Sequence, residues 1–134
     1  MRVTLDSSVL VAAHISRAGV CAELLEEVLL SHELVLSDYI LGELRKKLLE
    51  KFAFPEEFVE AAVSKLGRAA EVLEPAPVAS GTCRDREDLP ILGTATAGRS
   101  DVLVTVDKDL LALGSHKGID IIKPGDFWRR VRSQ

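Results

Sequence analysis

Apolar residues fall into two kinds of segment that alternate along the chain: short continuous runs and longer stretches with helical spacing. The short runs predict buried strands at 2–5, 34–36, 72–73, 102–106 and 119–122. The longer stretches predict helices at about 7–18, 20–31, 38–52, 55–66, 88–98, 108–113 and 126–132. Because continuous apolar strands alternate with helices, the pattern predicts a three-layer α/β/α fold around a central parallel sheet of about four to five strands.

Cap and loop residues agree with these boundaries. Ser37 or Asp38 can cap the third helix, and Pro55 can open the fourth. The stretch 75–88 is the long loop of the chain and is rich in Pro, Gly, Ser and charge, which is typical of functional loops. No repeat or composition shift interrupts the pattern, so we expect a single domain over 1–134.

The composition is that of a folded globular protein. Of 134 residues, 47% are hydrophobic and 28% are charged, while aromatic residues make up only 4%, so the core must be aliphatic. The net charge of −4 argues against binding nucleic acid through overall charge. An acidic site that acts on phosphates stays open, because a bound cation reverses the local charge.

The cysteines and the amino-terminal segment bear on the compartment. Cys21 and Cys83 have no Cys-x-x-Cys or Cys/His spacing, so they are interpreted as reduced thiols rather than as a zinc or redox site. The first apolar run is broken by Asp6, unlike a signal peptide, and no apolar stretch reaches the length of a membrane span. We therefore expect a cytoplasmic protein with no membrane contact.

Four acidic residues stand near one edge of the predicted sheet. Asp6 and Asp107 directly follow strands, Glu43 lies on the helix after a strand, and Asp88 begins a helix, with Asp85 just upstream. Sites in open parallel sheets form beyond the carboxyl ends of the strands. Carboxylates that meet there repel one another unless a hard cation neutralises them, and Mg²⁺ and Mn²⁺ prefer such oxygen ligands.

Each acid also has a purely structural interpretation. Asp6, Asp88 and Asp107 could be helix N-caps, which are common roles for aspartate. Glu43 could be a solvated residue paired with Lys47 at i+4. Their joint position at strand ends favours a metal site over four separate structural roles.

Four segments resemble the motifs of PIN-domain nucleases, in the same order and across almost the whole chain. They are VTLDSSVLVAA at 3–13, SDYILGELRKKL at 37–48, RDREDLPILGTA at 84–95 and DVLVTVDKDLL at 101–111. The Thr-x-Asp-x-Asp-Leu-Leu motif after a buried strand is the most specific of them. Within this family the chain is similar to the small toxin-type branch, which includes VapC-like toxins of prokaryotic toxin–antitoxin pairs.

The resemblance implies a metal-dependent ribonuclease that uses Mg²⁺ or Mn²⁺. It carries catalytic and metal-binding roles to Asp6, Glu43, Asp88 and Asp107 and supporting roles to Asp85, Asp109, Thr105 and Ser8. Many relatives have Asn at the position of Ser8, and a larger residue or Ala at that of Gly93. The resemblance also implies an RNA substrate, an antitoxin protein as partner and a homodimer.

Several basic residues could contact RNA. Arg84, Arg86 and Arg99 flank the expected site and are candidates for phosphate contacts. The run 45–47, Arg-Lys-Lys, is a solvated helix face, a second such contact or a contact for an acidic partner. Two other functions compete with the nuclease: a catalytically inactive PIN-like module that binds protein or RNA, and a phospho-acceptor signalling domain. The latter usually has paired acids after the first strand, whereas Asp6 is followed by two serines.

Overall fold

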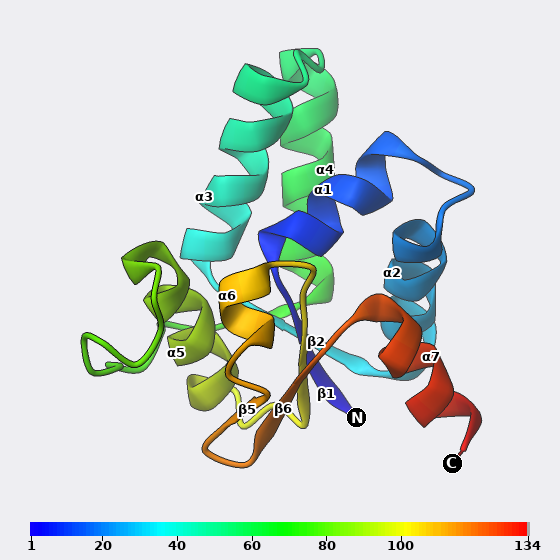
Figure 1. The fold of residues 1–134 in the computed structure, drawn as a ribbon. Helices are drawn as coiled ribbons and strands as arrows, with labels where there is room; N and C mark the ends of the chain where they lie inside the picture. The colour runs from blue at the N-terminus through cyan, green and yellow to red at the C-terminus, as the bar shows by residue number, and fades with distance from the viewer. Residues whose placement is uncertain (134) are drawn as a thin grey trace.

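A computed structural model describes residues 1–133 and places helices on both sides of a mainly parallel sheet (Figure 1). Its strands are β1 (Arg2–Leu5), β2 (Glu33–Leu36), β3 (Glu71–Val72), β4 (Val102–Val104), β5 (Ser115–His116) and β6 (Ile119–Ile122). They lie in the order β3-β2-β1-β4-β6-β5, and each neighbouring pair is parallel except β5 with β6. The predicted fold class and the five parallel strands are confirmed.

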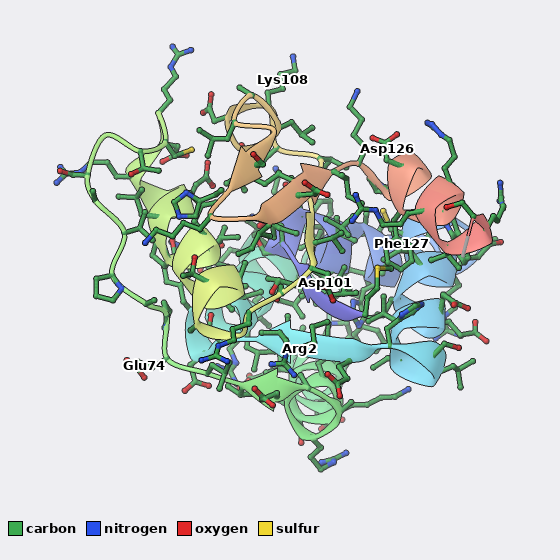
Figure 2. The ribbon with its side chains drawn as sticks, turned by 90° about the horizontal axis from the view of Figure 1, so that it is seen from below. Arg2, Glu74, Asp101, Lys108, Asp126 and Phe127 are labelled. Atoms are coloured by element: carbon green, nitrogen blue, oxygen red, sulfur yellow. The ribbon has the colours of Figure 1, made fainter. Side chains whose placement is uncertain are left out.

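The helices begin and end close to their predicted limits. They are α1 (Ser7–Ile15), α2 (Val20–Ser31), α3 (Asp38–Lys46), α4 (Glu56–Ala69), α5 (Leu89–Ala97), α6 (Lys108–Leu111) and α7 (Pro124–Arg132), with a π-helical turn η1 (Lys47–Lys51) and a 3₁₀ turn η2 (Arg86–Asp88). Helix α5 covers one face of the sheet, and α2 and α7 cover the other (Figures 1 and 2).

Two features differ from the predicted elements. The helix expected over 38–52 is α-helical only to Lys46 and continues as the π turn η1. The antiparallel strand β5 was not predicted, because it has only two residues and its pairing depends on a tight turn. Lys117 and Gly118 form this turn with φ of 49° and 81°, the left-handed conformations that suit two-residue hairpins.

The core is aliphatic, as the composition predicts. All three residues of β4 are buried, because the strand is covered on both faces. Phe127 of α7 is fully buried (Figure 2). The centre of its ring lies 5.7 Å from that of His32, which follows α2. Trp128 packs partly buried against the same core. These contacts pack α7 against α2.

The long loop before η2 packs closely on α5 at Gly93. A Cβ atom at this position would lie 2.3 Å from the carbonyl oxygen of Ala76, and the Ala76 N–H donates to the Gly93 carbonyl over 2.9 Å. Only glycine allows this approach, which explains why Gly93 stands inside a helix despite its low helix propensity. The contact positions the loop and the acids that follow it.

The amino ends of the strands carry an ion-pair cluster. Arg2 pairs with Glu33 at 3.0 Å and with Glu71 at 2.9 Å, and its backbone N–H donates to Asp101. Figure 2 shows Arg2 and Asp101 together at this edge. The cluster links β1 to β2, β3 and the start of β4.

No single helix within residues 1–133 is long and apolar enough to cross a membrane. Helices α1 and α2 pass this test only as a pair, and they are bent by 110° relative to each other.

Candidate metal centre

Asp6 stands at the carboxyl end of β1 with its side chain held by hydroxyl groups. It occupies the N-cap position of α1, but its carboxylate makes no capping hydrogen bond. Instead Oδ2 accepts from Ser8 Oγ at 2.8 Å and from Thr105 Oγ1 at 2.7 Å. The side chain is only 3% exposed. The alternative interpretation of Asp6 as a capping side chain is therefore wrong, and the carboxylate is oriented by a hydroxyl of α1 and by one from the residue after β4.

Ser7 connects Asp6 to the acid of α3. Its hydroxyl lies 3.2 Å from Glu43 Oε1 and 3.5 Å from Asp6 Oδ1, and it accepts a hydrogen bond of 2.8 Å from Lys47 Nζ. Tyr39 lies on the other side of Glu43, with its OH 3.4 Å from Oε2. The lysine thus donates to Ser7, and the Glu43–Lys47 ion pair of the alternative structural interpretation is not found among residues 1–133.

Thr105 links the first and last acidic motifs. Its hydroxyl donates to Asp6 and accepts from the Asp107 N–H at 2.9 Å. Asp107 caps α6, because its Oδ1 accepts from the N–H groups of Asp109 and Leu110 at 2.9 and 3.0 Å. The capping interpretation holds for this residue, although the cap uses only one of its two carboxylate oxygens.

Asp88 lies at the end of η2 and is 6% exposed. Its side chain makes no capping hydrogen bond to α5. Within residues 1–133 its carboxylate accepts one long hydrogen bond, from Cys83 Sγ at 3.8 Å. Carboxylate oxygens of Asp85, Asp88 and Asp109 lie within 4.8 Å of one another. These three acids could hold a metal ion.

The electrostatics of the site follow from burial and from like charges. Burial, and then the carboxylates of Asp107, Asp85 and Asp6, raise the pKa of Asp88 to about 7. Burial also raises the pKa of Glu43, against the opposing effects of Lys47 and the Ser7 hydroxyl. The acids that raise the pKa of Asp88 come from the residues after β1 and β4 and from the loop before η2.

The residues present fit a hard divalent cation. The donors are carboxylate oxygens with no histidine or zinc-type cysteine set among them, which suits Mg²⁺ or Mn²⁺ rather than a softer metal. The buried Asp88 carboxylate has almost no hydrogen-bond donors, so a proton, which its raised pKa favours, or a cation must neutralise it. A bound cation would supply this neutralising charge.

The structure groups most of the predicted site residues and separates one. Asp6, Glu43, Thr105 and Ser8 form one connected group, and Asp85, Asp88 and Asp109 form the other, with Asp107 between them. Arg84 and Arg86 lie on the loop and turn beside Asp88. Arg99 lies before β4, at the opposite edge of the sheet, so the expectation that it flanks the site is wrong.

Sequence reasoning missed three neighbours of the acids, Ser7, Tyr39 and Cys83. It named Lys47 as a possible i+4 partner of Glu43 and as part of the basic run 45–47, but it did not predict the contact of Lys47 with Ser7. Nothing in the sequence distinguishes Ser7 or Cys83, because their contacts come from residues far along the chain.

Two clefts adjoin the site. One, of about 520 Å³, is lined by Glu43 itself and by residues of α3, η1 and η2. The other, of about 710 Å³, lies beside Tyr39 and is lined by the loop 73–78, Arg86 and the start of α5. Glu43 thus faces one of these clefts, and Tyr39 lines both.

An α/β fold with acids from several segments at the carboxyl edge of a parallel sheet defines a class of candidate metal-binding hydrolases. A family model described as "PIN domain" matches residues 2–109, which contain all four predicted acids. This chain belongs to the PIN domain family, whose members are hydrolases of the nuclease type. No curated protein gives a significant match to the sequence.

Solved structures with the same fold include two toxin–antitoxin complexes. The chain matches VapBC2 from Rickettsia felis, bound to a DNA fragment from its promoter, with 14% identity and a TM-score of 0.64, covering 92% of this chain and 98% of that one. It matches VapBC-1 from nontypeable Haemophilus influenzae with 19% identity and a TM-score of 0.63, covering 93% and 99%. At these identities the likeness concerns the fold.

Proposed function

We propose that this protein is an endoribonuclease that hydrolyses RNA phosphodiester bonds with Mg²⁺ or Mn²⁺. The observation that carries the proposal is the position of Asp88, a buried carboxylate with few donors beside the carboxylates of Asp107, Asp85 and Asp6. Like charges held close together lower the free energy of unfolding. A role in binding a divalent cation accounts for such a grouping of carboxylates. Membership of a nuclease family supports this interpretation.

In this proposal Asp6, Glu43, Asp88 and Asp107 hold the cation, and Asp85 and Asp109 support it. The bound cation would activate water for attack and stabilise charge on the phosphoryl group. Thr105 and Ser8 fix the orientation of Asp6, and Ser7 fixes that of Glu43. Arg84 and Arg86, which are exposed beside Asp88, are the remaining arginine candidates for contact with RNA phosphates.

The biological role that we propose is the toxin of a type II toxin–antitoxin pair. The two VapBC structures that share the fold support it, and an antitoxin protein would then be the partner. A homodimer and a cytoplasmic location are parts of the same proposal; the free thiols of Cys21 and Cys83 agree with a reducing compartment. Light scattering of the purified protein, alone and with the product of an adjacent gene, tests the dimer and the partner.

The central experiment combines cleavage and metal binding. Purified protein is incubated with single-stranded and structured RNAs in Mn²⁺, Mg²⁺ or EDTA, beside an Asp6→Asn variant and an Asp126→Asn control on the distant helix α7. We expect cleavage that requires metal, survives in the control and is lost in Asp6→Asn. Calorimetry with Mn²⁺ should show binding to the wild type and weaker binding to Asp6→Asn.

The inactive binding module is the second candidate, and the side-chain cap that Asp107 provides to α6 favours it. Under this alternative the RNAs stay intact in every condition and calorimetry detects no Mn²⁺ binding. That pair of results would replace the nuclease with a module whose acids have structural roles.

A further inference from the structure

Lys47 has an unusual position for a lysine beside an acidic site. Its ammonium donates to Ser7 Oγ at 2.8 Å, and the same hydroxyl lies 3.2 Å from Glu43 and 3.5 Å from Asp6. One intervening hydroxyl therefore separates the positive charge from each of two carboxylates. Lys47 is half-buried at the start of η1, and its side chain reaches Ser7 of α1.

The bonding of this ammonium is incomplete. An ammonium has three N–H donors, and its one hydrogen bond within residues 1–133 goes to a neutral hydroxyl. A lysine serving only to neutralise Glu43 would pair with that carboxylate directly. Lys47 also lines the cleft of about 520 Å³ beside Glu43, so its remaining donors are next to open space that reaches this acid.

We propose that Lys47 binds an RNA phosphate in this cleft and holds the strand against the acidic site. This inference rests on the proposed function and names a substrate-binding residue for it. A lysine ammonium binds phosphate as a point charge, and the Ser7 contact keeps that charge beside Asp6 and Glu43.

The other charged residues of the cleft lead to a second prediction, that RNA binding requires a divalent cation. Lys46 and Lys51 line it together with Lys47, but so do four acids, Asp38, Glu43, Glu50 and Glu87. The acids outnumber the lysines, so the cleft alone should repel a polyanion. We therefore expect RNA to bind only when a divalent cation offsets the carboxylates, with Lys47 adding the phosphate contact.

The test measures RNA binding separately from cleavage. A labelled single-stranded oligoribonucleotide is titrated with protein in Ca²⁺ at several salt concentrations, and gels verify that the RNA stays intact. For the wild type we expect binding in Ca²⁺ and none in EDTA. Lys47→Met should lower the affinity at least about tenfold and reduce the slope of log affinity against log salt by about one.

Matched variants separate a phosphate contact from a structural role. Lys47→Arg should restore the slope, and Lys65→Met, which removes an exposed lysine of α4 outside this cleft, should leave affinity and slope unchanged. Calorimetry should show that Lys47→Met binds Mn²⁺ as tightly as the wild type or more tightly, because a nearby positive charge is removed. A structural role would instead weaken Mn²⁺ binding.

The outcomes also distinguish this inference from the proposed function. If the wild type cleaves RNA and Lys47→Met keeps the wild-type slope, the phosphate contact is wrong and the nuclease stands. If Lys47→Met loses Mn²⁺ binding, Lys47 is a structural residue of the metal site. If the wild type binds RNA with the expected Lys47 dependence but never cleaves it, the nuclease fails and the contact stands. A wild type that neither binds nor cleaves RNA overturns both.

Discussion

Thr105 donates a hydrogen bond of 2.7 Å from Oγ1 to Asp6 Oδ2 and thereby joins the carboxyl ends of β4 and β1. The same hydroxyl accepts from the Asp107 N–H at 2.9 Å. One fully buried side chain thus orients the carboxylate of the first motif and the backbone of the last. The adjacent sheet positions of β1 and β4 make this arrangement possible.

Replacement of Thr105 by valine should test how far this hydroxyl supports the site. Valine keeps the shape but leaves Asp6 and the Asp107 N–H each without one partner, so we expect about tenfold weaker Mn²⁺ binding and a loss of roughly 1–3 kcal/mol in the free energy of unfolding. Thr4→Val is the control, since Thr4 is equally buried and bonds Ser100 at 2.7 Å. It should cost stability without changing Mn²⁺ affinity; equal Mn²⁺ affinities in both variants would contradict the prediction.

Two substitutions at Asp107 should separate its cap from metal binding. Asparagine keeps an oxygen that can accept from the N–H groups of Asp109 and Leu110, whereas alanine removes it. In urea unfolding we expect Asp107→Ala to lose about 1 kcal/mol and Asp107→Asn to lose less. Both should bind Mn²⁺ more weakly by calorimetry. Wild-type affinity in Asp107→Asn would show that this residue is only a helix cap.

The raised pKa of Asp88 predicts a stability that falls with rising pH in the absence of metal. The ordinary pKa is 3.8 and the folded value is about 7, so between these values the unfolded chain has lost a proton that the folded chain keeps. The unfolded state then binds fewer protons, and the free energy of unfolding decreases as pH rises through this window. The raised pKa of Glu43 acts with the same sign.

Thermal unfolding in EDTA at about pH 5 and about pH 8 measures this effect. One pKa unit corresponds to about 1.4 kcal/mol, so we expect a decrease on the order of a few kcal/mol in the wild type and a much smaller one in Asp88→Asn. Added Mn²⁺ should stabilise the wild type more at the higher pH, where the proton no longer competes. An equal decrease in the variant would assign the pH dependence to other groups.

Substitution of Gly93 by alanine should disturb the site from a distance. The added Cβ would lie 2.3 Å from the Ala76 carbonyl oxygen and 3.1 Å from Pro75 Cβ, so backbone must move. We expect a loss of at least about 1–3 kcal/mol in the free energy of unfolding, together with weaker Mn²⁺ binding. Gly67→Ala is the matched control: its Cβ would make only a 3.8 Å contact with Leu41, so the variant should gain about 0.5–1 kcal/mol. A neutral Gly93→Ala would show that the loop does not depend on this contact.

The local pattern of the chain was sufficient for most of the fold. The continuous apolar runs of β1 and β4 and the limits of α2 follow from hydrophobic spacing, because burial is what these segments share in any parallel sheet. Hydrophobic spacing does not predict the strand β5 or the π turn η1, because a two-residue pairing and a change of helical register leave almost no periodic signal. The expectation that Arg99 flanks the site was wrong because Arg99 is near Asp88 in the sequence but is separated from it in space by the full length of α5.

The sequence by itself determined that carboxylates such as Asp6 and Asp107 follow parallel strands, and hence that they share one edge of the sheet, because parallel strands end on the same side. Only the tertiary structure decided which groups surround them. It placed Lys47 on Ser7, and Cys83 beside Asp88. These contacts depend on side-chain positions from elements far apart in the chain. Hydrophobic periodicity sets which face of an element is buried, and packing alone sets which side chains meet there.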